Sequence, residues 1–389
     1  MKIGIDKIGF AMPKYYLDIK DLAKARGIEE EKFTKGLMQL EMSVTPVTQD
    51  IVTLGAAASF EILDDEDLKN IDMIIVGTET GVDQSKAASI FIHNLLDVQP
   101  FVRSIELKEA CYGATAGLDF AKNHILANPS SSVLLIASDI AKYGINSSGE
   151  STQGAGSCAM LIKKDPRILT FNCDNVCLTR DVMDFWRPNY SPYAFVDGKF
   201  STEQYLDCLT TTWEKYKEKN NKVLNDFDAV CLHIPYPKLA LKGLNTLIDI
   251  ENSTSELNNK LQNNFTDSII YSQRVGNIYT GSLFLGLLSL LENNNTLKED
   301  DKVLFYSYGS GAVSEIFSMT LCKDFKKYLR SDRLDDFNKR VRISVAEYEK
   351  MFFESTLPDK DGNIKFDFED NSKFIFEKIE NHKRIYAKK

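Results

Sequence analysis

Buried strands and amphipathic helices alternate along the chain, and the hydrophobic pattern locates most of them. Residues 3–10 alternate in the manner of a half-buried strand, whereas residues 18–26 and 48–63 repeat apolar positions at helical spacing. Short, almost purely apolar runs follow, such as those within 71–80 and 132–139. Runs of this length are typical of strands buried on both faces of a sheet. The pattern therefore predicts an α/β protein.

A similar order of elements occurs twice. In the first half, a buried strand ends at a polar crest, a second strand runs into a helix, and further strands flank a glycine turn. Residues 227–236, 268–291 and 302–319 repeat strand, strand into helix, strand and glycine turn. The offset of roughly 165 residues is too long for a solenoid repeat and indicates a duplicated domain half. Related halves sharing one core would bring their strand ends to a common central site.

We therefore predict one fused globular unit made of two halves, residues 1–170 and 171–389. The segment at about 180–220 starts with an aromatic stretch that contains two prolines. A long connection of this kind predicts a loop that covers a cleft. The charged tail after Cys322 predicts strands and helices on a solvated surface, without chemistry of its own.

The second part of this inserted segment is predicted to be a helix. It would begin at about Thr202, with Ser201 as the N-cap and Gln204 completing a capping box.

Composition narrows the class of protein. The 389 residues carry a net charge of −9, which argues against a nucleic-acid surface. The longest apolar run, 279–291, is too short to cross a bilayer, so no membrane contact is expected. Seven scattered cysteines without a signal peptide indicate reduced thiols and a cytoplasmic protein. Cys173 and Cys177 are the only close pair, and no metal site is predicted.

Cys111 is the candidate nucleophile. It lies between a predicted strand and the small-residue helix GATAGLDFAKN. At a helix N-terminus, the dipole and free amides favour the thiolate, which suits acyl transfer by covalent catalysis. A buried, inert cysteine is the alternative, and the local sequence leaves these two interpretations about equally weighted.

Two further residues, each at the end of a predicted strand, could accept or donate protons. Glu79 closes the first-half strand IIVGT, where partial desolvation would raise its pKa and make it a base. His233 closes the second-half strand AVCL and is followed by Ile-Pro-Tyr-Pro, which prevents a helix. Taken singly, a solvated loop acid and a structural histidine are at least as plausible. The thiol, carboxylate and imidazole together favour a catalytic site.

These residues stand in stretches that resemble the hydroxymethylglutaryl-CoA synthase family over essentially the whole chain. The matching stretches include GTETGVDQSKA around Glu79, EACYGATAGLDFA around Cys111 and HIPYPKLALKGL around His233, with DFWRPNYSPYAFVDGKFS, VGNIYTGS and YSYGSGAVSE elsewhere. The resemblance implies a thiolase-like αβαβα layered fold with a C-terminal extension, and a homodimer whose sheet continues across the interface. It implies acetyl-CoA and acetoacetyl-CoA as substrates, the mevalonate pathway of isoprenoid biosynthesis as context, and no cofactor.

The resemblance also implies three roles. Cys111 would be acetylated by acetyl-CoA, and Glu79 would remove a proton from the acetyl methyl group. His233 would bind the second thioester and stabilise or protonate its oxygen after attack. The backbone amides of Cys111 and Ser310 are the expected oxyanion-hole donors, each worth on the order of 3 kcal/mol.

Further positions are predicted to bind substrate. Asn277 could hold the acetoacetyl carbonyl or cap a helix, and Lys238 or Lys242 could bind the CoA phosphates or be solvated. The remaining expected contacts border the cleft: Tyr143, Thr152, Asp184, Ser201 and Ser310.

Two other functions stay open at this stage. A ketoacyl synthase of the same fold is one, although the acid at Glu79 suits deprotonation of acetyl rather than decarboxylation of malonyl groups. A catalytically idle paralogue that only binds acyl-CoA is the other, although such a copy need not keep the acid, thiol and imidazole together.

Overall fold

A computed structural model describes residues 1–389. Its main feature is a ten-stranded mixed sheet in the order β12-β13-β14-β8-β1-β7-β6-β4-β5, with β9 paired to β14. The strands are β1 (Ile3–Ala11), β4 (Ile71–Gly77), β5 (Arg103–Leu107), β6 (Ser132–Ile140), β7 (Ala155–Lys164), β8 (Leu169–Phe171), β9 (Val176–Thr179), β12 (Ala229–Leu232), β13 (Lys302–Gly309) and β14 (Val313–Leu321).

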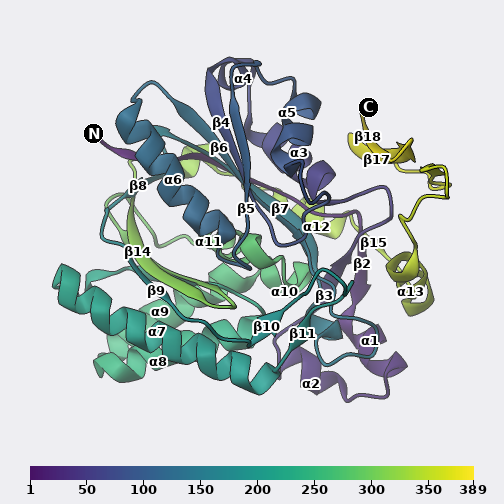
Figure 1. The fold of residues 1–389 in the computed structure, drawn as a ribbon. Helices are drawn as coiled ribbons and strands as arrows, with labels where there is room; N and C mark the ends of the chain where they lie inside the picture. The colour runs from purple at the N-terminus through teal and green to yellow at the C-terminus, as the bar shows by residue number, and fades with distance from the viewer.

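Helices cover the outer face of the first-half strands and the outer face of the second-half strands, and further helices lie between these two groups of strands (Figure 1). One outer layer packs on the first-half strands, a second packs on the second-half strands, and two helices lie between. These layers are α3 (Ile51–Ile62) with α5 (Ala88–Leu96), then α7 (Gly198–Asn220), α8 (Pro237–Glu251) and α9 (Ser255–Ile269), and centrally α6 (Gly113–Ala127) with α11 (Ser282–Asn293). The predicted αβαβα layering is confirmed.

The central layer determines where the site forms. Helix α11 is buried at ten successive positions, which explains why its sequence is apolar on all sides. Helix α6 packs against the end of β4 so closely that a Cβ at Gly77 would lie 2.4 Å from the backbone nitrogen of Ala114. Only glycine fits there, and the contact brings the crest after β4 beside the start of α6.

Most predicted elements are present, and two predictions were wrong. Residues 268–271 do not form a strand, because Leu257, Leu261 and Phe265 repeat at intervals of four and extend α9 to Ile269. Helix α7 begins at Gly198 instead of Thr202.

The start of α7 is set by a different cap from the one predicted. The carboxylate of Asp197 accepts the backbone N–H of Phe200 at 3.1 Å, so Asp197 is the N-cap. Ser201 lies inside the helix, where its hydroxyl is free for another contact.

Smaller elements extend the layered unit. They are α1 (Ile19–Ala25), α2 (Glu30–Thr34), α4 (Asp65–Asn70), α10 (Ser272–Val275), α12 (Arg333–Asn338), α13 (Val345–Phe353), β2 (Tyr15–Asp18), β3 (Glu41–Val44), β10 (Phe185–Trp186), β11 (Phe195–Val196), β15 (Val341–Arg342), β16 (Ile364–Lys365), β17 (Phe374–Glu380) and β18 (Lys383–Lys388). None of the helices has both the length and the apolar character needed to span a membrane.

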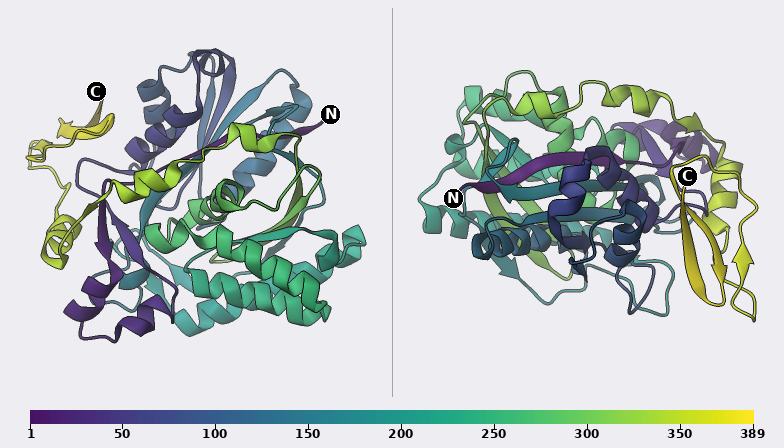
Figure 2. Two further views of the ribbon diagram at one scale, coloured as in Figure 1. Left: turned by 180° about the vertical axis from the view of Figure 1, so that it is seen from behind. Right: turned by 90° about the horizontal axis from the view of Figure 1, so that it is seen from above.

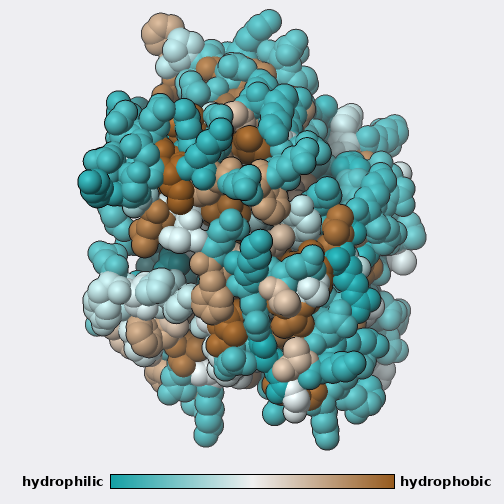
Figure 3. Space-filling view, turned by 90° about the vertical axis from the view of Figure 1, so that its right-hand side faces the viewer, coloured by the Kyte–Doolittle hydropathy of each residue, from teal (hydrophilic) through white to brown (hydrophobic).

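The C-terminal tail is more than a solvated surface. Seen from behind, the segment bearing α12 crosses the molecule to reach α13 and the β17–β18 hairpin (Figure 2). Figure 3 shows the side that carries these elements, where hydrophilic residues dominate and apolar patches lie between them. Phe374, Phe376 and Tyr348 are nevertheless buried. The hairpin also holds the α3 N-cap, because Arg384 and the Tyr386 hydroxyl both donate to Asp50.

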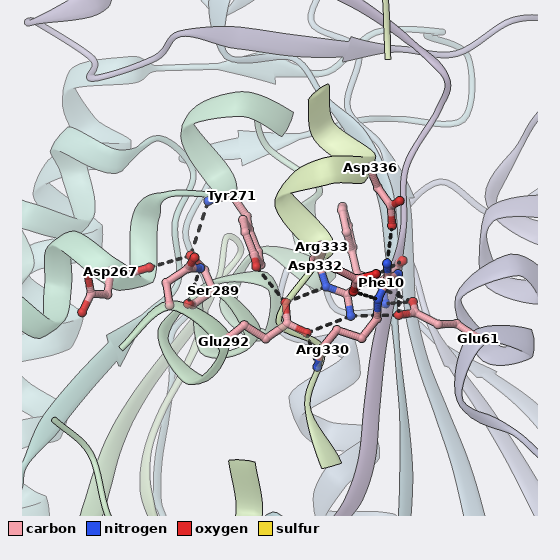
Figure 4. A network of polar contacts seen from close by, with 11 residues as sticks. Phe10, Glu61, Asp267, Tyr271, Ser289, Glu292, Arg330, Asp332, Arg333 and Asp336 are labelled. Carbon is pink, nitrogen blue, oxygen red and sulfur yellow. Dashed lines mark hydrogen bonds and ion pairs between the residues drawn. The ribbon is translucent and has the colours of Figure 1, made fainter. Parts of the chain in front are cut away.

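A buried ion-pair network joins two of the helical layers (Figure 4). Arg333 on α12 donates to Glu292 on α11 at 2.7 and 2.9 Å, and it also contacts Glu61 on α3. Arg330 pairs with the same Glu61 at 3.3 Å. Helix α12 therefore connects the outer layer of the first half to the central layer.

Candidate active site

A cavity of about 250 Å³ opens where the strand ends of the two halves meet. Its wall includes Cys111 from the first half and His233 from the second, although 122 residues separate them in the sequence. Phe185 and Val196, from the β10–β11 hairpin, also line it. The aromatic segment therefore contributes to the wall of this cavity. That it covers the cleft stays a prediction.

Cys111 lies immediately before α6, preceded by Ala110 in a left-handed conformation with φ of +38°. A non-glycine residue in this region is strained, and such strain is common where a nucleophile is held at a sharp turn. The thiol donates a hydrogen bond to Oε1 of Glu79 at 3.1 Å. The sulfur and the carboxylate, predicted only to share a pocket, are thus in direct contact.

The protonation state of Cys111 differs from the prediction. Burial, followed by the neighbouring Glu79 carboxylate, raises the pKa of the thiol well above its usual value. The helix dipole expected to favour the thiolate is outweighed by desolvation and by three nearby acids, Glu79, Asp139 and Asp184. Cys111 therefore rests as a thiol with its proton already directed at a base.

Glu79 lies two residues beyond the end of β4, and its environment suits a base. Burial, together with the charge of Asp139, raises the pKa of the Glu79 carboxyl to about 8. The expectation of a raised pKa from partial desolvation is confirmed. A carboxylate with this pKa is a far stronger base than a solvated glutamate, yet it still ionises near neutral pH.

Asp139, at the end of β6, holds this crest in place. One of its carboxylate oxygens accepts the backbone N–H of Glu79 at 2.9 Å and the hydroxyls of Thr78 and Thr80. The other accepts the hydroxyl of Thr280, from the second half, at 2.6 Å. A buried Asp ending an apolar strand was the available signal, but the sequence did not show which groups it would bind.

Arg187 also fixes the crest, because its guanidinium donates to the backbone carbonyl of Glu79. It comes from the cleft-covering segment, just after β10. The role of Arg187 was missed in the sequence, since nothing local shows where a loop arginine will reach.

His233 follows β12 directly and is 2% exposed. Its backbone N–H donates to Tyr306 on β13, and its carbonyl accepts the Tyr205 hydroxyl at 2.8 Å. Burial lowers the pKa of the imidazole to about 3, so the ring is neutral near pH 7. A neutral imidazole can donate one N–H and accept at its other nitrogen.

Two backbone amides on the pocket side are available to an oxyanion. The N–H groups of Cys111 and Ser310 donate to no acceptor within the protein. The next amide, Gly311 N–H, is used by Asp184 at 3.1 Å. Ser310 lines the cavity beside Cys111, so the two expected donors lie on one wall.

A hydrogen-bonded pair, Asn277 and Tyr143, forms another part of the wall. The Asn277 side-chain amide donates to the Tyr143 hydroxyl at 2.9 Å, while its oxygen accepts the N–H of Tyr279. Asn277 therefore caps a turn and also lines the pocket, so both predicted roles are compatible. Thr152 lines the pocket too, and the rings of Tyr143, Phe185 and Tyr279 pack edge to face about this point.

Asp184 does not line the cavity, contrary to expectation. It is fully buried beneath the wall, where its carboxylate accepts the hydroxyls of Ser201 and Tyr308 at 3.1 and 2.9 Å. A buried carboxylate needs several donors, and three surround this one. Ser201 and Tyr308 do line the cavity, so Asp184 supports the wall from behind.

The two candidate lysines do not line the cavity, although Tyr236 and Leu239 beside Lys238 do. Lys238 and Lys242 are on the first turns of α8, where Lys238 is half-buried and Lys242 is exposed. Neither forms an ion pair within the protein. The N–H of Lys238 donates to the carbonyl of Leu37, a residue of the cavity wall.

Comparisons with known proteins agree on one family. The family models described as hydroxymethylglutaryl-coenzyme A synthase N terminal and C terminal match residues 1–166 and residues 174–268 and 248–387. A hydroxymethylglutaryl-CoA synthase of Enterococcus faecalis is 48% identical over 99% of this chain and 100% of its own length. The polyketide biosynthesis 3-hydroxy-3-methylglutaryl-ACP synthase PksG of Bacillus subtilis is 30% identical over 94% of this chain and 92% of its own.

Solved structures agree with these matches. A crystal structure of HMG-CoA synthase complexed with CoA superimposes with a TM-score of 0.98 at 54% identity, covering all of both chains. MvaS in complex with 3-hydroxy-3-methylglutaryl coenzyme A superimposes with a TM-score of 0.91 at 30% identity, covering 100% of this chain and 99% of that one.

Proposed function

We propose a detailed mechanism for this chain, which belongs to the hydroxymethylglutaryl-CoA synthase family. The chain is an acyl-transferring condensing enzyme that joins acetyl-CoA, acetoacetyl-CoA and water to give 3-hydroxy-3-methylglutaryl-CoA and CoA. The observation that carries our assignment of roles is the 3.1 Å hydrogen bond from the Cys111 thiol to Glu79.

In the first step, the Cys111 sulfur attacks the thioester carbon of acetyl-CoA. Glu79 accepts the thiol proton as the carbon–sulfur bond forms, and the proton then leaves with the departing CoA thiolate. The free N–H groups of Cys111 and Ser310 stabilise the oxyanion of the tetrahedral intermediate. The products are acetyl-Cys111, free CoA and an ionised Glu79.

In the second step, the ionised Glu79 removes a proton from the acetyl methyl group. The resulting enolate attacks the ketone carbon of acetoacetyl-CoA, and a carbon–carbon bond forms. The neutral His233 donates a hydrogen bond from its ring N–H to the ketone oxygen as that oxygen becomes an alkoxide. The proton that Glu79 took from the methyl group then passes to this alkoxide, which gives the tertiary hydroxyl and an ionised Glu79. Water then hydrolyses the thioester to Cys111, which frees the product and restores the thiol.

The acetyl donor is proposed to be acetyl-CoA, with a carrier protein as the alternative. The chain is 48% identical to the CoA-dependent relative but only 30% identical to the ACP synthase. Lys238 and Lys242 on the first turns of α8 are unpaired cations that suit the phosphates of CoA. The product then serves the mevalonate pathway.

We also propose a homodimer. Strand β5 ends the sheet and pairs only with β4, so its outer edge leaves backbone groups free. Phe101, just before this strand, is 89% exposed. Pairing of two β5 edges would continue the sheet, and Phe101→Asp should shift the protein to a monomer in sedimentation velocity. A monomeric wild type would contradict the proposal.

Seven free cysteines support a reducing, cytoplasmic location. An exposed thiol such as Cys173 persists most readily in such a compartment.

The roles of Cys111 and Glu79 can be tested separately with isotopically labelled acetyl-CoA. Cys111→Ala should take up no label, whereas Cys173→Ala, which removes an exposed thiol, should be labelled as the wild type is. Glu79→Gln removes the base but keeps the shape, so condensation should fall by at least about a thousandfold. Unchanged condensation in either Cys111→Ala or Glu79→Gln would overturn the mechanism.

A further inference from the structure

Tyr348, on helix α13 of the C-terminal extension, reaches the underside of the pocket wall. The wall on this side is the 141–154 loop between β6 and β7, which carries Tyr143 and Thr152. Tyr348 is 3% exposed, and its hydroxyl lies among the buried polar groups of that loop. A buried tyrosine hydroxyl cannot bond to bulk water, so its hydrogen-bond partners must come from the protein.

The Tyr348 hydroxyl makes two contacts to the loop. It accepts the side-chain N–H of Gln153 at 2.7 Å, and it donates to the carboxylate of Glu150 at 3.2 Å. Both partners are 4% exposed. Removing the hydroxyl would leave each of them with one fewer partner in a dry environment.

Gln153 passes this contact to the pocket. Its side-chain oxygen accepts the backbone N–H of Tyr143 at 2.7 Å and that of Gly144 at 3.2 Å. The Tyr143 hydroxyl in turn accepts from Asn277. A path of contacts therefore runs from Tyr348 through Gln153 to the Tyr143 backbone, and from there through the Tyr143 side chain to Asn277 in the cavity wall.

Glu150 fixes the other end of the loop. Its carboxylate accepts Arg26 in a bidentate pair at 2.9 and 2.7 Å and also accepts the backbone N–H of Asn146. Arg26 ends α1 and pairs with Glu349 on α13 as well. The loop is thus held from outside the pocket by α1 and α13.

We propose that Tyr348 is a positioning residue that sets the acetoacetyl-binding wall of the pocket through Gln153. This inference rests on the proposed function, since it concerns the second substrate of that reaction. Tyr348 lines no part of the cavity, so it acts only through the residues it holds. Glu79, which accepts the Cys111 thiol, is held by Asp139, and no hydrogen bond joins Tyr348 or Gln153 directly to Cys111 or Glu79.

Tyr348→Phe removes the hydroxyl and keeps the ring that packs on Phe352. The KM for acetoacetyl-CoA should rise about tenfold, the size of effect expected when one buried hydrogen bond is lost. The kcat and the rate of Cys111 acetylation by acetyl-CoA should stay within about twofold of wild type, because an interaction made equally in ground and transition states changes KM alone.

Tyr216→Phe is the matched control. Tyr216 is also buried, and its hydroxyl donates to Asp174, but it lies at the far end of α7. This variant should lose comparable stability in thermal melts and keep the wild-type KM. An equal rise in KM for Tyr216→Phe would show a general loss of stability and would overturn the proposal.

A second variant tests the same contacts independently, in case Tyr348→Phe fails to fold. Gln153→Met removes the link at its middle, so it should raise the KM for acetoacetyl-CoA as Tyr348→Phe does. The double variant should be no worse than the weaker-binding single variant, because both changes break the same path of contacts. Independent effects, or a KM for Tyr348→Phe within twofold of wild type, would overturn the inference. A wild type that forms no product would instead refute the proposed function.

Discussion

At the scale of single residues, the chemistry depends on how burial sets two protonation states. Desolvation raises the pKa of Glu79 to about 8 and lowers that of His233 to about 3. The first group is therefore a base that ionises within the working range, and the second stays neutral throughout it. In the proposed mechanism the carboxylate moves protons, while the imidazole contributes a fixed hydrogen bond.

The pH dependence of condensation follows from these two groups. Glu79 must be ionised to accept a proton, so kcat/KM should rise with pH along a limb centred near 8. His233 contributes no limb above about pH 4, because it is already neutral there. The measurement is kcat/KM for acetoacetyl-CoA from pH 6 to 9.5. A rate that is flat from pH 6 to 8 would contradict the raised pKa.

Glu79 should also reduce stability as pH rises. Its folded pKa of about 8 exceeds the unfolded value of about 4.5, so the folded state holds more protons between these values. Stability from this group is present below about pH 4.5 and is lost as pH rises through 8. Glu79→Gln removes this loss, so its melting temperature should exceed that of wild type at pH 8 and match it at pH 4.5. A lower melting temperature at pH 8 would refute the sign.

Sequence alone identified the three residues proposed to react but not their contacts. Cys111, Glu79 and His233 could be found because each ends an apolar strand or begins a small-residue helix. The 3.1 Å contact between Cys111 and Glu79 could not, since it depends on packing across 32 residues. Asp184 was misplaced for the same reason: a polar residue in an aromatic segment gives no sign of which way it faces.

At the scale of elements, the sequence contains two candidate N-cap residues at the start of α7. Both Asp197 and Ser201 are good N-cap residues, and the sequence favoured Ser201 because Gln204 follows three residues later. In the structure, Asp184 binds Ser201 and leaves Asp197 to cap the helix. A tertiary contact thus decided between two equally plausible caps.

Asp197→Ala should destabilise the fold by about 1 kcal/mol, because it leaves the Phe200 N–H without its acceptor. Lys199→Ala, in the same turn and largely exposed, should change stability by less than about 0.5 kcal/mol. Urea denaturation of both variants measures the difference. Equal stabilities would argue against Asp197 as the cap.

At the scale of the whole molecule, the five layers that the family resemblance implied are present, whereas the repeated order of elements predicted two related halves. The repetition is imperfect, because the second half has no counterpart of β5 where residues 268–271 belong to α9 and the turn after it. The prediction of a solvated surface for the tail after Cys322 was incomplete, because a few of its side chains are buried although its sequence is mostly charged. Tyr348 is one of these, and Arg333 is another.

Arg333 should be among the most sensitive positions for stability. Its side chain is 2% exposed and pairs with Glu292, which is equally buried. Arg333→Met leaves Glu292 without this partner in the core, which should cost about 3–5 kcal/mol. Arg342→Met, an exposed arginine in the neighbouring strand, is the control and should cost less than about 1 kcal/mol. Similar losses for both in calorimetry would show that the network contributes little.

The most direct test of the account is rapid-quench mass spectrometry of the peptide that contains Cys111. On mixing with acetyl-CoA, the wild type should carry an acetyl group on Cys111, and addition of acetoacetyl-CoA should convert it to the product adduct before release. Glu79→Gln lacks the base of both steps, so it should form the acetyl adduct more slowly than the wild type and should not convert that adduct to the product adduct. Acetyl found on another cysteine, or product formed with Cys111 never modified, would contradict the claim that this thiol and its neighbouring carboxylate carry out the condensation.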